Sequence, residues 1–175
     1  RSINFATLCT GEESITKEQL KSVMGLQFHE IGEKFFPDFH DDYALSIMKK
    51  CFEAECAALR KQGGKLYPKL EETLYRLSRK FPLFIVSNCN GGYIETFLEY
   101  HKLSKYFKDF KCAGETGLPK GESVKSMIRK YKLKHAVYVG DTVSDLDASK
   151  TAGIPFIYAS YGFGNVKSCD NKIDS

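Results

Sequence analysis

The chain has 175 residues, of which 42% are hydrophobic and 13% aromatic, a composition typical of a globular protein and not of a disordered chain. Its length suits one domain of modest core, or a core domain with a small insertion. The 26 basic and 22 acidic residues leave a formal charge of +4. Both signs are interspersed, which indicates a mixed solvated surface and no nucleic-acid groove.

Residues 1–66 read as helical throughout and contain no strand-like run. The sequence TKEQ at 16–19 is a capping-box pattern that predicts the start of a helix. Between Asp42 and Arg60, apolar residues recur at helical spacing and predict a longer helix with one buried face. The members of this apolar stripe are Leu45, Met48, Phe52 and Cys56.

A Gly- and Pro-bearing connector, KQGGKLYP at 61–68, precedes a region with a different rhythm. The sequence KLEETLYRLSRK predicts an amphipathic helix, and FPLFIVSN predicts a strand buried on both faces. A helix through Ile94, Phe97 and Leu98 follows, and then a weaker strand near FKCAG.

The same alternation continues to the end of the region. Helices are expected over about 122–132 and 144–152, and strands over HAVYVGD and PFIYASYG. Strands that alternate with helices predict βαβ units and a parallel sheet. The fold class is therefore α/β, with a Rossmann-like core over residues 67–175 and a helical region over 1–66.

Polar side chains follow the predicted strands where ligands bind in such folds, beyond the carboxyl ends of the strands. Ser87 and Asn88 end one strand, Asp141 ends another, and Asp145 lies in the turn after it. Lys120, in GLPKGES, precedes a helix whose dipole disfavours a cation there, so an anion is expected nearby. A hydroxyl, an amide, a lysine and two carboxylates together predict a phosphate held beside Mg²⁺, which prefers oxygen ligands.

Structural roles stay open for most of these residues. Ser87 and Asn88 also suit the end of a strand and the cap of a helix, and Lys120 also suits an exposed surface. Asp145 completes the capping box TVSD. A purely structural role is least expected for Asp141, because it is a carboxylate directly after a strand and a glycine.

The order of these residues resembles that of the haloacid dehalogenase (HAD) superfamily. IVSN is similar to its second motif, LPKGES to its third and VGDTVSD to its fourth. DASKTAGIPFIYASYGFG resembles the helix and closing strand of the phosphoglycolate-phosphatase-like branch. The resemblance covers about residues 68–164, and residues 1–66 are similar in placement and length to the helical cap of that branch.

One motif of that family does not occur in these 175 residues. The family's first strand ends in Asp-x-Asp-Gly-Thr, whose first Asp attacks phosphorus and whose second acts as acid and base. PDFHDD at 37–42 has a different spacing and no apolar strand before it. In the family this strand is central, between those of the second and fourth motifs, and without it two interior strands keep unpaired backbone groups. We therefore expect the α/β core to be incomplete at both ends.

The resemblance implies a Mg²⁺-dependent phosphatase that hydrolyses a small phosphate monoester through an aspartyl-phosphate. In that interpretation Ser87 donates to a phosphoryl oxygen, with the Asn88 backbone nearby, and Lys120 offsets the charge of the transferred group. Asp141 holds the metal, and Asp145 binds it directly or through water. Ser87, Lys120 and Asp141 are the catalytic candidates, and Ser87, Asn88 and Lys120 the substrate-binding ones.

Three other functions use a similar set of residues. A phosphosugar mutase of the same branch and a non-catalytic HAD-like binding protein both stay open, whereas a receiver-like signalling domain would have no helical cap. The expected partner is a small phosphorylated metabolite in the cytoplasm, with no nucleic acid and no membrane, since no apolar run approaches about 18 residues. The cap residues offered for substrate recognition are Lys17, Lys21, Lys34, His29 and His40.

The six cysteines form no C-x-x-C pair, and none lies beside a histidine at zinc-ligand spacing. They are Cys9, Cys51, Cys56, Cys89, Cys112 and Cys169. Reduced, partly buried thiols of a cytosolic protein are expected. Cys89 falls beside the predicted site, where we interpret it as a packing residue.

Overall fold

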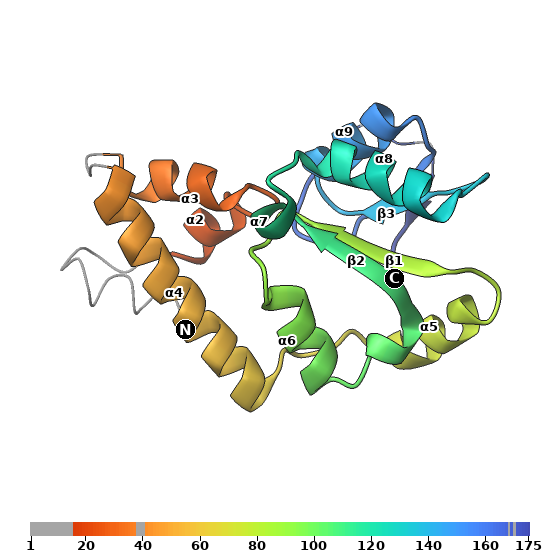
Figure 1. The fold of residues 1–175 in the computed structure, drawn as a ribbon, viewed down its shortest axis with the longest axis horizontal. Coiled ribbons are helices and arrows are strands. Elements are labelled where there is room, and N and C mark those ends of the chain that lie inside the picture. Colours follow the sequence, from red (N-terminus) through yellow and green to blue (C-terminus); the bar gives the residue numbers. More distant parts are fainter. Residues whose placement is uncertain (1–15, 38–40, 168, 170) are drawn as a thin grey trace.

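A computed structural model describes residues 16–37, 41–167, 169 and 171–175. Three helices lie together on one side of the molecule, with the strands and the remaining helices on the other (Figure 1). These three, called the cap helices below, are α2 (Lys17–Lys21), α3 (Phe28–Phe35) and α4 (Asp41–Gln62). Cys9 and His40, which the sequence analysis considered, lie outside the described residues.

The cap helices form where the sequence predicts helices. Thr16 and Gln19 make the predicted capping box, with the Gln19 backbone N–H 3.2 Å from Thr16 Oγ1 and the Thr16 N–H 2.8 Å from Gln19 Oε1. On α4 the apolar stripe buries Met48 and Cys56, while Leu45 at one end stays 39% exposed. Helices α3 and α4 share one apolar cluster centred on Phe36, Ile47 and Met48.

The remaining elements alternate as the sequence predicts. They are α5 (Leu70–Ser78), β1 (Leu83–Ser87), α6 (Tyr93–Tyr100), a 3₁₀ turn (Ser104–Tyr106), β2 (Phe107–Cys112), α7 (Ala113–Thr116), α8 (Lys120–Tyr131), β3 (Tyr138–Gly140), α9 (Val143–Ala152), β4 (Phe156–Ala159) and β5 (Lys172–Ile173). All three strand pairings within the described part of the chain are parallel, which confirms the α/β prediction. Two short elements, α7 with four residues and β5 with two, were not predicted from the sequence.

The strands of the described residues form two sheets, β1–β2 and β3–β4–β5. β1 pairs with β2 along one edge, and β3 pairs with β4 along one edge. The other edge of each strand pairs with no strand in the part of the chain that the structure describes. Across the gap between β1 and β3, the Tyr138 hydroxyl donates to the Val86 carbonyl oxygen at 2.9 Å. The sequence predicts β1 to be buried on both faces, but every residue of β1 is only half-buried, because one edge lies open.

Helices α8 and α9 connect the two sheets. They pack on each other, with α8 also against β1 and β2 and α9 against β3 and β4. Gly121 permits their close approach, since a Cβ there would lie 2.6 Å from the Thr151 Cβ.

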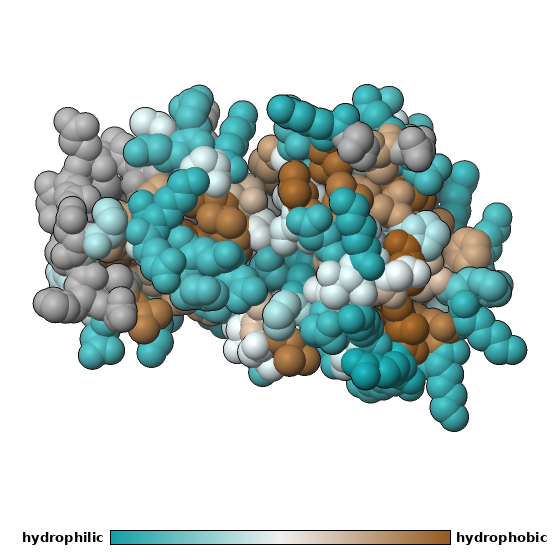
Figure 2. Space-filling model, turned by 90° about the horizontal axis from the view of Figure 1, so that it is seen from above, coloured by the Kyte–Doolittle hydropathy of each residue, from teal (hydrophilic) through white to brown (hydrophobic). Residues whose placement is uncertain are grey.

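The outer surface carries polar side chains over most of the face in Figure 2, with apolar ones in smaller groups between them. This is the mixed surface that the composition predicts. Within the ranges given above, no helix is both long and apolar enough to cross a membrane.

Candidate functional site

A cavity of about 730 Å³ lies between the cap helices and the strand ends. Its lining includes all five residues that the sequence analysis selected, namely Ser87, Asn88, Lys120, Asp141 and Asp145. Ser87 is the last residue of β1, Asp141 follows β3 directly, and Lys120 is the first residue of α8. The parallel strands end at the same side, which is why residues 54 positions apart in sequence meet here.

Lys120 and Asp145 form a buried ion pair, with 2.7 Å between Nζ and Oδ1 and only 9% of each side chain exposed. The anion expected beside Lys120 is therefore a residue of this chain. Burial raises the pKa of the Asp145 carboxyl, but the charge of Lys120 and hydrogen bonds from Lys120 and Thr142 outweigh it and hold the pKa below its usual value. Asp145 is thus kept ionised.

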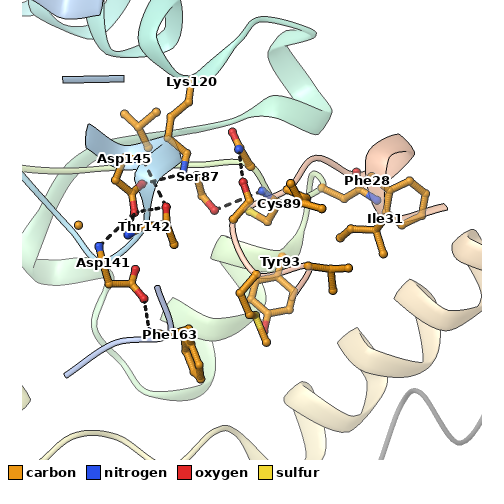
Figure 3. Close-up of a pocket in the computed structure, with 18 of the residues that line it drawn as sticks. Phe28, Ile31, Ser87, Cys89, Tyr93, Lys120, Asp141, Thr142, Asp145 and Phe163 are labelled. Carbon is orange, nitrogen blue, oxygen red and sulfur yellow. Dashed lines mark hydrogen bonds and ion pairs between the residues drawn. The ribbon is translucent and has the colours of Figure 1, made fainter. Parts of the chain in front are cut away.

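The second oxygen of Asp145 is also occupied. Oδ2 accepts from the backbone N–H of Asp141 at 3.1 Å, the N–H of Thr142 at 3.0 Å and the Thr142 hydroxyl at 2.8 Å. The Asp145 N–H returns a bond to Thr142 Oγ1 at 3.2 Å, which completes the predicted capping box. Asp145 therefore fixes both the ammonium of Lys120 and the turn that carries Asp141 (Figure 3).

Asp141 is held from the other side by a loop that sequence reasoning missed. Its Oδ2 accepts from the Phe163 backbone N–H at 2.7 Å. A Cβ on Gly162 would clash with the Asp141 side chain, and one on Gly164 would clash with the Asp141 backbone oxygen. The glycines of YGFG let this loop approach so closely, and they are the only sequence signal of the contact.

Ser87 and Asn88 differ in what they contact. Ser87 Oγ accepts from the Cys89 N–H at 3.2 Å, and the residue lines the cavity. Asn88 Nδ2 donates to the Gly25 carbonyl oxygen at 2.7 Å and to Ser144 Oγ at 3.3 Å. Its Oδ1 is buried and has no hydrogen-bond partner among the described residues. Asn88 thus joins the loop between α2 and α3 to the start of α9, a contact that the sequence analysis did not predict.

The donor set suits an oxygen-preferring cation only in part. Among the described residues, no three histidine, cysteine, aspartate or glutamate side chains gather closely enough to hold a metal ion by themselves. Asp141 uses one carboxylate oxygen for Phe163, and no hydrogen bond to its other oxygen is found among those residues. A single carboxylate together with phosphate oxygens and water matches the coordination that Mg²⁺ accepts.

The described cysteines, Cys51, Cys56, Cys89, Cys112 and Cys169, are all free thiols. Cys89 lines the cavity, and burial raises its pKa. Burial likewise raises the pKa of Cys112 to about 12. Neither thiol is primed as a nucleophile, in line with the packing role expected for Cys89.

Comparison with known proteins identifies relatives at the level of family and fold. A sequence model described as haloacid dehalogenase-like hydrolase matches residues 2–159. Phosphoglycolate phosphatase from Escherichia coli is 24% identical over 138 residues, which are 76% of this chain and 55% of that protein. The chain thus spans about half the length of the curated relative it matches.

Solved structures resemble this one along nearly its whole length. A haloacid dehalogenase-like hydrolase from Bacteroides fragilis superposes with a TM-score of 0.87 at 19% identity, covering 99% of this chain and 87% of that one. CbbY from Rhodobacter sphaeroides, solved in complex with phosphate, gives a TM-score of 0.83 at 16% identity, covering 100% and 85%. At these identities the likeness is one of fold.

Proposed function

This chain belongs to the haloacid dehalogenase-like hydrolase family, and on that premise we propose that the whole protein is a Mg²⁺-dependent phosphatase. Its reaction is the hydrolysis of a small phosphate monoester through an aspartyl-phosphate intermediate. The observation that carries the proposal is the convergence of the Ser87 hydroxyl, the Lys120 ammonium and the Asp141 carboxylate on one cavity.

Each of these groups has a task in phosphoryl transfer. The Ser87 hydroxyl donates to a phosphoryl oxygen and orients the ester. The Lys120 ammonium, kept in place by Asp145, lies in a water-poor setting where it offsets charge that develops in the transition state. Asp145 pairs with Lys120 and positions the turn on which Asp141 is carried.

Asp141 is the direct metal ligand in this proposal, since one of its oxygens stays available. Both oxygens of Asp145 already accept hydrogen bonds, so Asp145 would support the metal site without being a direct ligand. When bound, Mg²⁺ supplies charge neutralisation to the phosphoryl oxygens.

The attacking aspartate comes, in this proposal, from a strand that occupies the gap between β1 and β3. Two observations support that position: both strands have an open edge there, and their carboxyl ends carry Ser87 and Asp141. A parallel strand in the gap would end beside these two residues and satisfy the unpaired backbone groups.

The test compares two proteins in Mg²⁺ with a panel of small phosphate monoesters. One consists of these 175 residues; the other has the same residues preceded by the first strand and Asp-x-Asp-Gly-Thr turn of a relative. Turnover is expected of the second protein alone, and it should disappear when the first Asp of the turn is changed to Asn. Comparable turnover by the 175 residues, or none by either protein, contradicts the proposal.

A further inference from the structure

The cap side of the cavity is apolar and rich in aromatic rings. Phe28, Phe52 and Tyr93 form a continuous ring contact, with centroids 6.3 Å apart for the first pair and 6.5 Å for the second. The side chains of Leu26, Ile31, Phe35 and Met48 extend this wall. In Figure 3, Phe28 and Ile31 lie across the cavity from Lys120 and Asp145, with Tyr93 between.

The charges around the cavity are unevenly distributed. Among the described residues that line it, Lys120 is the single cation, whereas Glu55, Asp141 and Asp145 are carboxylates. The ammonium of Lys120 is on the strand side and is paired with Asp145. On the cap side the charged group is Glu55 of α4, so a second anion placed there would meet like charge.

Glu55 and Tyr93 form a hydrogen-bonded polar pair within the otherwise apolar wall. The Tyr93 hydroxyl is hydrogen-bonded to Glu55, and burial raises the pKa of Tyr93 to about 12. Burial raises the pKa of Glu55, although the hydrogen bond with Tyr93 opposes the rise. The phenol therefore stays protonated at neutral pH and is committed to the glutamate.

Three of the cap residues that the sequence offered for recognition of an anionic substrate do not line the cavity. Lys21, His29 and Lys34 are exposed and are not among its lining. The Lys34 ammonium instead donates to the Ser22 carbonyl oxygen at 3.0 Å.

From this wall we infer that the substrate's leaving group is uncharged and apolar, and carries a ring that packs against Phe28, Phe52 and Tyr93. A leaving group with a second negative charge, such as a short carboxylate, binds poorly. This inference rests on the proposed phosphatase function and names its substrate class. The inferred substrate class therefore differs from the substrate in the name of the phosphoglycolate phosphatase relatives.

The inference is tested by calorimetric titration of the 175-residue chain in Mg²⁺ with three stable probes. Inorganic phosphate reports on the phosphate site, phenylphosphonate adds an apolar ring, and phosphonoacetate adds a carboxylate. Phenylphosphonate should bind at least about tenfold more tightly than phosphonoacetate, the low end of what a hydrophobic pocket discriminates.

Two matched variants locate the cause. Glu55→Gln removes the cap charge and should strengthen phosphonoacetate binding several-fold, with little change for phenylphosphonate. Glu53→Gln, an exposed position on the same helix outside the cavity lining, should change neither. If phosphate binds, and phosphonoacetate binds as tightly as phenylphosphonate or more tightly, the inference is overturned but the proposed phosphatase site is not. If none of the probes binds, phosphate included, the proposed phosphatase site is wrong and the inference fails with it.

Discussion

Lys120 and Asp145 lie 25 residues apart in sequence and meet as a buried ion pair, with 2.7 Å between Nζ and Oδ1. From the sequence, Lys120 would act on a bound phosphoryl group and not on the fold. In the structure its side chain is buried and neutralises a carboxylate, so the same lysine also stabilises the native state.

The first prediction is that Lys120→Met destabilises the protein by about 3–5 kcal/mol, because Asp145 is left as a buried charge without its ionic partner. Urea denaturation followed by circular dichroism measures the change. Adding Asp145→Asn should recover part of the loss.

The control for this prediction is Lys125→Met on the same helix. Lys125 pairs with Glu122 at the surface, where the two side chains are 39% and 41% exposed, and its loss should change stability by no more than about 0.5 kcal/mol. Equal stability of the two lysine variants would mean that the buried pair contributes nothing.

Thr142 is the subject of the second prediction. Thr142→Ala removes both the acceptor of the Asp145 N–H and a donor to the Asp145 carboxylate. A loss of about 0.5–2 kcal/mol is expected, as is typical of a helix cap. Thr142→Ser should keep most of the stability, whereas Thr16→Ala, at the exposed cap of the five-residue α2, should have a smaller effect on global unfolding.

The third prediction concerns Gly140, the last residue of β3. A Cβ at this position would overlap the Asp145 side chain, with 2.6 Å to its Cγ. Gly140→Ala should therefore cost about 1–3 kcal/mol, the usual price of overpacking. Gly64→Ala is the matched control, because a Cβ there meets nothing within 4 Å. If thermal melts of the two alanine variants coincide, the close approach of Gly140 and Asp145 is wrong.

The fourth prediction tests the metal site with Asp141→Asn and Asp147→Asn. Loss of the Asp141 charge should lower Mg²⁺ affinity by more than the roughly 10–100-fold typical of groups that only support a ligand. Asp147 has a side chain 64% exposed and lies 3.8 Å from Lys150, so its substitution should leave affinity unchanged. Titration calorimetry on both variants decides between them, and equal affinities would remove Asp141 from the proposed metal site.

The sequence predicted the parts of this fold that depend on local pattern. Periodicity located α4, turn chemistry located the Thr142 capping box at the start of α9, and the strand ends located Ser87 and Asp141. Lys120 was expected just ahead of a helix beginning at about residue 122 and is the first residue of α8, so the helix begins about two positions earlier than expected.

Contacts between distant segments escaped prediction. Periodicity carries no information on the bond from Phe163 to Asp141, or on that from Asn88 to Gly25. Nor does it reveal that Lys120 is buried, because burial depends on how α8 packs against α9. Such pairings follow only from the three-dimensional arrangement of elements that the sequence identifies one by one.

The division of the strands into two sheets has a consequence for cooperativity. No backbone ladder of the described residues crosses from β1 to β3, so the two sheets are coupled by the packing of α8 on α9 and by side-chain bonds. These bonds join Tyr138 to Val86, Asn88 to Ser144 and Lys120 to Asp145. Helix packing without a shared ladder permits one half to open while the other stays closed. Amide hydrogen exchange should therefore resolve two opening units, one containing β1 and β2 and one containing β3 and β4. A strand bound in the gap should merge them into one.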